Sequence, residues 1–153
     1  MAAVADSGPL ISAVQSDDAA HPLARELVGA LGRELVVLMP VLAEVDYMVR
    51  KRAGAEPGRR LLRAIREGEH TAAFLTPGLL ARAVEIDAQY AHLELGFVDA
   101  SIMAFAERHK LPILTFDFRH FRATKPAKGD WRLLLDEGTL ARALDPRRLG
   151  KPR

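Results

Sequence analysis

Short apolar runs alternate with amphipathic stretches along most of this chain. Runs of Val, Leu and Ala that end at a turn signal are typical of buried strands, and apolar residues three or four positions apart are typical of helices. The predicted strands cover residues 2–5, 34–39, 70–75, 112–115 and 131–135. The predicted helices cover residues 9–14, 22–30, 40–53, 59–67, 76–90 and 97–109. This alternation predicts an α/β fold with a central parallel β-sheet flanked by helices on both faces.

Prolines and glycines predict where several of these helices begin and end. Pro22 and Pro40 suit the first turn of a helix, because a proline at that place gives up no backbone hydrogen bond. Gly54 and the pair Pro57-Gly58 predict a break in the chain before the helix that is expected from residue 59.

The length of 153 residues predicts one domain that can bury a substantial core. We expect this domain over residues 1–140, followed by a basic C-terminal tail over residues 141–153. The chain is 49% apolar and 27% charged, which is ordinary for a globular protein. Its net charge of +2 permits a polyanionic partner without requiring one.

Cysteine is absent, which excludes disulfides and thiolate metal sites and fits a reducing compartment. The longest uninterrupted apolar stretch, residues 35–43, is far shorter than the roughly 20 residues of a membrane span. Asp6 interrupts the first apolar run, so no secretion signal is expected. The sequence therefore predicts a soluble, cytoplasmic protein that does not enter a membrane.

Four acidic residues lie where the predicted elements turn over at one rim of the sheet: Asp6, Glu44, Asp99 and Asp117. Asp6 and Asp117 follow predicted strands, whereas Glu44 and Asp99 lie on the apolar faces of predicted helices. Residues beyond the carboxyl ends of parallel strands converge on one crevice, so these carboxylates are expected to lie close together. Such a cluster repels itself unless a cation compensates its charge. Oxygen ligands without Cys or His favour Mg²⁺ or Mn²⁺.

Each acid also has a purely structural explanation. Asp6 and Asp99 can cap helices, and Asp117 can form a turn. Glu44 is harder to explain in this way, because a carboxylate beside an apolar stripe is unfavourable unless it is paired or bound to a metal. The joint pattern is therefore stronger evidence for a site than any one acid. Other catalytic signatures, including a Gly-x-Ser-x-Gly turn and a phosphate-binding loop, are absent from the sequence.

The segments that carry these acids resemble the motifs of PIN-domain nucleases, and the third of them is most similar to the VapC-type toxins of type II toxin–antitoxin pairs. The segments are VADSGPL at 4–10, PVLAEV at 40–45, YAHLELGFVDAS at 90–101 and LTFDFRHF at 114–121. Their order and spacing extend the resemblance over about residues 2–135.

The resemblance implies a PIN-like fold and a Mg²⁺- or Mn²⁺-dependent endoribonuclease that acts as a toxin. It assigns the catalytic and metal-binding roles to the four acids and a supporting role to the hydroxyls of Ser7 and Thr115. It also implies a homodimer, a cognate antitoxin, and a transfer RNA or ribosomal RNA substrate. Hydrolysis by metal-activated water would need no ribose 2′-hydroxyl.

RNA would be held by cations outside the acidic cluster. The candidates are Arg119 and Arg122 beside the fourth acid, and Arg50 and Lys51 at the end of the second acid's helix. For each of these cations, the alternative to RNA binding is an ordinary position on a solvated helix face. The arginine-rich helix at 59–67 has the same alternative, and it could also dock an antitoxin. Only 6% of the residues are aromatic, which disfavours a base-stacking platform.

Three other functions remain open at this stage. A housekeeping RNA-processing nuclease of the same family would use the same acids. A non-catalytic module that binds RNA or protein would use them only as caps and turn formers. A metal-dependent phosphohydrolase of another α/β fold usually carries a second acid close behind the first aspartate, where this chain has Ser7-Gly8-Pro9.

Overall fold

The computed structural model describes residues 1–145 and 147. Its centre is a four-stranded parallel sheet with the strand order β3-β2-β1-β4. The strands are β1 (Ala3–Ala5), β2 (Leu35–Leu38), β3 (Thr71–Ala73) and β4 (Ile113–Leu114). Val4 fixes the register at the middle of the sheet, because it pairs with Val36 on one side and with Ile113 on the other.

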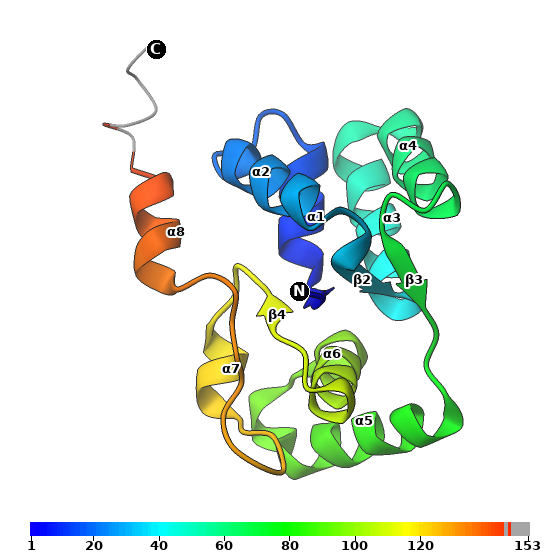
Figure 1. Cartoon of the computed structure of the whole chain (residues 1–153), viewed down its shortest axis with the longest axis vertical. Coiled ribbons are helices and arrows are strands. Elements are labelled where there is room, and N and C mark those ends of the chain that lie inside the picture. Colours follow the sequence, from blue (N-terminus) through cyan, green and yellow to red (C-terminus); the bar gives the residue numbers. More distant parts are fainter. Residues whose placement is uncertain (146, 148–153) are drawn as a thin grey trace.

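Helices cover both faces of this sheet. They are α1 (Ser7–Val14), α2 (His21–Leu31), α3 (Met39–Ala53), α4 (Ala55–Arg66), α5 (Pro77–Gln89), α6 (Gly96–His109), α7 (Arg119–Ala123) and α8 (Glu137–Ala143), with short 3-10 turns η1 (Gly32–Glu34) and η2 (Ala91–Leu93). Figure 1 shows α5 and α6 below the strands and α1, α2 and α4 above them. The predicted fold class is confirmed.

The inner strands are buried on both sides. Every residue of β1 and three of the four residues of β2 are buried, with no alternation of buried and exposed positions. That pattern is expected of parallel strands between two helical layers. The main core is built on these strands and on the inward faces of α3 and α6. The buried strands therefore hold in place the chain segments that lead to Asp6, after β1, and to Asp117, after β4.

No described helix is long and apolar enough to cross a membrane.

The predicted break at Pro57-Gly58 is wrong. The chain does turn at Gly54, whose φ of 89° ends α3, but α4 starts at once and runs through both residues. A proline is tolerated in the first turn, since the backbone N–H groups there have no helical partner. Gly58 is buried, and a Cβ atom placed on it would lie 2.9 Å from Arg50 Cγ. The glycine therefore allows α3 and α4 to approach each other.

The predicted strand at 131–135 is also wrong. This segment makes only one isolated parallel bridge, between Leu133 and Ile113. The neighbouring strand β4 has just two residues, so it offers too short an edge for a further ladder. Two short helices, α7 and α8, were not predicted.

The end of the described chain differs in part from the expected tail. Helix α8 extends to Ala143 and so crosses the domain boundary that was predicted at residue 140. Residue 147 is described, and the Arg147 side chain donates to Asp145. The remainder of the predicted tail, residues 146 and 148–153, lies outside the described residues.

Candidate active site

Asp6 lies directly after β1 and caps the N-terminus of α1. The Ser7 backbone N–H donates to Asp6 Oδ1 at 2.7 Å, and the Thr115 hydroxyl donates to Asp6 Oδ2 at 2.7 Å. Only 7% of Asp6 is exposed. The capping role that the sequence left open is therefore real, and it holds the carboxylate in a fixed orientation beside the end of β4.

The environment of Asp6 favours its protonated form. Burial is the largest cause, and it raises the pKa of Asp6 from 3.8 to about 6. The hydrogen bond from Thr115 acts in the opposite direction, while the nearby charges of Asp99 and Glu44 raise this pKa further. A cation among these carboxylates would lower it again, because it would favour the charged form.

Thr115 joins two of the acids. It is fully buried just after β4, and its Oγ1 accepts the backbone N–H of Asp117 at 3.0 Å while it donates to Asp6. The hydroxyl thus fixes the turn that carries Asp117 against the end of β1. This contact brings together residues more than one hundred positions apart in the sequence.

Asp117 lies at the open side of the site, and its side chain is 46% exposed. Arg119 donates three hydrogen bonds to its carboxylate. The backbone N–H and Nε both donate to Asp117 Oδ1 at 3.2 Å, and Nη2 donates to Oδ2 at 3.2 Å. This hydrogen bonding with the Arg119 side chain holds the pKa of Asp117 below its usual range. The Asp117 carboxyl is therefore charged more readily than an ordinary aspartate.

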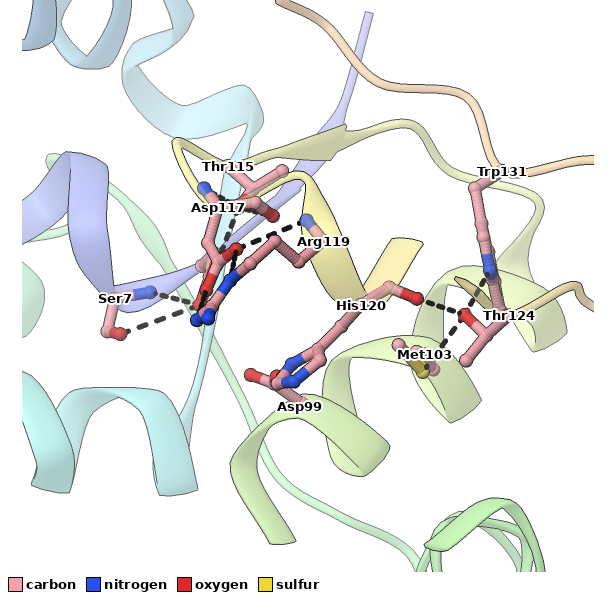
Figure 2. A network of polar contacts seen from close by, with 10 residues as sticks. Ser7, Asp99, Met103, Thr115, Asp117, Arg119, His120, Thr124 and Trp131 are labelled. Atoms are coloured by element: carbon pink, nitrogen blue, oxygen red, sulfur yellow. Dashed lines mark hydrogen bonds and ion pairs between the residues drawn. The ribbon is translucent and has the colours of Figure 1, made fainter. Parts of the chain in front are cut away.

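Asp99 occupies the first turn of α6, with 22% of its side chain exposed. Its Oδ2 contacts Nδ1 of His120, which reaches across from α7 (Figure 2). Burial raises the pKa of Asp99, the His120 contact lowers it, and the charges of Asp117 and Glu44 raise it. Asp99 thus interacts electrostatically with two other acids of the predicted cluster, Asp117 and Glu44.

Glu44 lies in α3 and is half-buried. Within the described part of the chain, its side chain has neither a hydrogen bond nor an ion pair. It nevertheless acts on the site, because its charge raises the pKa of both Asp6 and Asp99. Glu44 is therefore the acid with the least protein contact at its carboxylate.

The acids fit a hard divalent cation in donor type and in charge, since buried carboxylates that raise one another's pKa need a compensating cation. Among the described residues, no three Asp, Glu or His side chains are grouped closely enough to hold one metal ion. The carboxylates of Asp99 and Asp117 instead contact His120 and Arg119.

Of the four cations expected to hold RNA, only Arg119 contacts a site acid in the described structure. Arg122 lies on the same short helix but pairs with Glu137. Arg50 pairs with Asp46 at 2.8 Å. Lys51 lies 5.9 Å above the ring of Tyr47. Arg50 and Lys51 are about two turns from Glu44 along α3.

The sequence did not identify the residues that hold α7 in place. Trp131 Nε1 donates to Thr124 Oγ1 at 3.0 Å, and the same Oγ1 donates to the His120 carbonyl oxygen at 2.7 Å. Figure 2 shows this chain of contacts leading from Trp131 through Thr124 to His120 and Asp99. His120 was not among the residues that the sequence singled out. Its position three residues after Asp117 was the available signal.

The fold and the acids define an α/β domain with a carboxylate site at the carboxyl ends of its parallel strands, the usual place for a ligand in this architecture. A sequence model of the PIN domain family matches residues 3–126, and the chain belongs to that family. PIN domains are nucleases, so the predicted family and enzyme class are confirmed. Nucleases of the VapC type in this family generally depend on a divalent metal.

Known proteins support this assignment. Ribonuclease VapC26 of Mycobacterium tuberculosis is 29% identical over 127 residues, covering 82% of this chain and 94% of that protein. The crystal structure of VapC20 from the same species, a Sarcin-Ricin loop cleaving toxin, has a TM-score of 0.73 at 19% identity, covering 80% and 95% of the two chains. A toxin–antitoxin complex from Klebsiella pneumoniae has a TM-score of 0.61 at 19% identity, covering 86% and 100%.

Proposed function

We propose that this protein is the toxin of a toxin–antitoxin pair, an endoribonuclease that hydrolyses RNA at Asp6, Glu44, Asp99 and Asp117 with Mg²⁺ or Mn²⁺. The observation that carries the proposal is the state of Asp6: a buried carboxyl with a pKa of about 6, raised in part by two further acids. Buried acids that oppose one another's ionisation are unfavourable for a fold that uses them only as caps. They suit a site that receives a cation.

Each residue has a separate task in this proposal. Thr115 and the Ser7 backbone N–H orient Asp6, so its carboxylate does not have to be ordered when the cation arrives. Glu44 offers a carboxylate that neither hydrogen-bonds nor pairs with any side chain in the described part of the chain. A bound divalent cation would lower the pKa of water and offset the charge of the scissile phosphate. Either Glu44 or an aspartate could accept the proton of the attacking water.

The finer identity of the substrate is part of the same proposal. Transfer RNA and ribosomal RNA are the two candidates, and VapC20 is itself a Sarcin-Ricin loop cleaving toxin. Mapping the ends of the cleavage products would separate these two substrates. A small antitoxin reading frame next to the gene would favour the toxin over a housekeeping nuclease.

We propose that an antitoxin docks in a groove of about 1040 Å³ between α1, α2 and α4. The apolar side chains that line it include Leu10, Val14, Val28 and Leu61. Its charged lining is mainly cationic, with Arg25, Arg33, Arg60 and Arg63 against Glu67 and Glu69. An amphipathic segment with acidic residues along one side fits this combination of charge and apolar surface.

The homodimer that the resemblance implies has a candidate surface on α5. Leu80 and Val84 are four residues apart and therefore share one face of the helix, and both are exposed. Phe74, just before α5, and Phe97, at the start of α6, are exposed as well. Light scattering of wild type and of Val84→Lys would test whether a second copy covers these side chains, since the variant should then be monomeric.

The decisive experiment is cleavage of total RNA by the purified protein. Wild type with Mg²⁺ or Mn²⁺ should give discrete fragments, which should vanish with EDTA and with Asp99→Asn. Asp87→Asn is the matched control, because Asp87 is an exposed acid on α5. If all samples behave alike and calorimetry detects no metal binding, the nuclease proposal fails and the non-catalytic binding module remains.

A further inference from the structure

Two of the four site acids are held by neighbouring residues of α7. Arg119 directs three N–H groups at the carboxylate of Asp117, and His120 directs Nδ1 at Asp99. Arg119 and His120 are consecutive in the sequence, yet their partners lie on different elements, the turn after β4 and the first turn of α6. The two adjacent donors therefore bridge the site.

The influence of each donor also extends beyond its own partner. The charge of His120 lowers the pKa of Asp117, and Asp99 interacts electrostatically with Arg119. Both donors thus stabilise the same patch of negative charge. Stabilising this charge is also what a bound cation does, so the two side chains and the cation act on the same carboxylates.

The backbone of α7 is anchored on the side away from the acids. Thr124, almost fully buried, accepts from Trp131 and donates to the His120 carbonyl oxygen. Phe121 is buried in the main core and stacks edge-on against Trp131, with ring centroids 6.3 Å apart. The Arg119 side chain, in contrast, is 77% exposed. Motion of the donors is therefore confined to their side chains.

We propose that Arg119 and His120 are exchangeable occupants of the acidic site: they hold Asp117 and Asp99 when no metal is bound, and metal binding releases both side chains toward the RNA phosphate. The inference rests on the proposed function. It gives a common role to two contacts that join neighbouring residues of α7 to acids on different elements. The exchange keeps the negative charge of the acids compensated before the metal binds, and it supplies phosphate-binding donors after the metal has bound.

A simpler explanation is that the Arg119–Asp117 contact only stabilises a turn. The backbone N–H of Arg119 also donates to Asp117, as in ordinary aspartate turns. That explanation predicts lower thermal stability when Arg119 is removed, with no effect on metal affinity. Exchange instead predicts tighter metal binding, because removing a competing donor leaves the carboxylate free for the ion.

The test is calorimetric titration of the metal-free protein with Mn²⁺. We expect Arg119→Ala and His120→Ala each to bind Mn²⁺ roughly three- to tenfold more tightly than wild type, the range of a partly exposed charge interaction. Arg119→Lys, which keeps the charge but loses the planar fork, should fall between. Arg122→Ala is the matched control, because Arg122 lies on the same helix and pairs with Glu137. Its Mn²⁺ affinity should equal that of wild type.

RNA binding gives a second readout with the opposite sign. At saturating Mn²⁺, the Arg119→Ala and His120→Ala variants should show a KM for RNA raised about tenfold, since the released donors then contact phosphate. Tighter metal binding combined with weaker substrate binding is not expected from a residue that merely stabilises the fold. Unchanged or weaker Mn²⁺ binding in both variants overturns the proposal.

Side-chain NMR of the wild type keeps the test independent of whether the variants fold. Adding Mg²⁺ should shift the Arg119 Nε–H and His120 ring signals and leave those of Arg122 in place. Unmoved Arg119 and His120 signals on a protein that binds Mg²⁺ overturn the exchange alone. A wild-type protein that binds neither Mg²⁺ nor Mn²⁺ overturns the metal site as well, so the two failures are distinguishable.

Discussion

Asp6 differs from the other acids of the site in how little of it reaches water. It is almost fully buried, whereas Asp99 and Glu44 are partly exposed and Asp117 lies at the open side. The pKa of Asp6 and the pKa of Asp99 are raised, and that of Asp117 is lowered. Among the three aspartates, the two more buried ones therefore resist ionisation and the most exposed one favours it.

The raised pKa of Asp6 predicts that the metal-free protein loses stability as the pH rises. Between the ordinary value of 3.8 and the folded value of about 6, the unfolded chain releases this proton first, so ionisation favours the unfolded state. Asp6→Asn keeps the cap but cannot ionise. In EDTA, we expect it to match wild type near pH 4 and to exceed it by roughly 2–3 kcal/mol above about pH 7. Urea denaturation across this range measures the difference, and parallel curves would contradict the prediction.

Thr115→Val should impair catalysis more than its small change in shape implies. The variant loses the hydroxyl that donates to Asp6 and accepts from Asp117, leaving two buried polar contacts unmade. We expect a loss of stability of about 1–3 kcal/mol and a fall in RNA cleavage of at least tenfold. The resemblance gives the Ser7 hydroxyl a supporting role as well, but this hydroxyl lies 3.5 Å from Asp6, a weak contact. Ser7→Ala is therefore the control and should change cleavage less than about twofold. Equal effects of the two substitutions would refute the assigned role of Thr115.

At the scale of elements, the sequence predicted correctly those helices that carry a long and consistent apolar pattern. The helices α3, α5 and α6 begin and end close to their expected limits, since each carries an apolar face together with proline, glycine or a capping residue. The sequence also singled out the four acids, because each lies at the end of a strand or on a helix face that carries apolar residues; their role as the site stays a prediction.

The elements that sequence could not predict depend on tertiary contacts. Helix α7 has five residues, too few for a periodic signal, and is held by Thr124 and by buried Phe121. The apolar segment 131–135 resembles a strand, but its partner β4 is only two residues long. The contacts of Arg119 and His120 with the acids were invisible for the same reason, since they require α7 to be in place.

The packing of α3 on α4 gives a prediction that distinguishes two helical glycines. A Cβ atom on Gly58 would lie 2.9 Å from Arg50 Cγ, whereas nothing lies within 4 Å of the corresponding position on Gly29 in α2. Gly29→Ala should therefore raise the free energy of unfolding by roughly 0.5–1 kcal/mol through helix propensity. Gly58→Ala should give no gain, or a loss, because Arg50 must move and leave Asp46. Thermal unfolding of both variants is the measurement, and an equal gain at the two sites would show that the helices do not pack this closely.

At the scale of the whole molecule, the acids and the groove occupy opposite rims of the sheet. Asp6 and Asp117 follow β1 and β4, whereas Gly32 and His70, which line the groove, precede β2 and β3. Because all strands are parallel, these positions lie at the carboxyl and amino ends of the sheet respectively. An antitoxin anchored in the groove must therefore extend round the molecule to reach the acids, and anchoring and inhibition become separable steps.

This separation predicts that charge reversal at the groove frees the enzyme from its antitoxin without stopping RNA cleavage. Arg60→Glu places an acid in the cationic lining, so an acidic antitoxin segment should bind about tenfold or more weakly, with the largest difference at low salt. Arg66→Glu is the matched control, because Arg66 is exposed on the same helix and does not line the groove. Cleavage assays with increasing antitoxin should show that the Arg60→Glu enzyme escapes inhibition while the Arg66→Glu enzyme does not. If both remain fully inhibited, the antitoxin is held elsewhere, and the basic face of α4 serves another purpose.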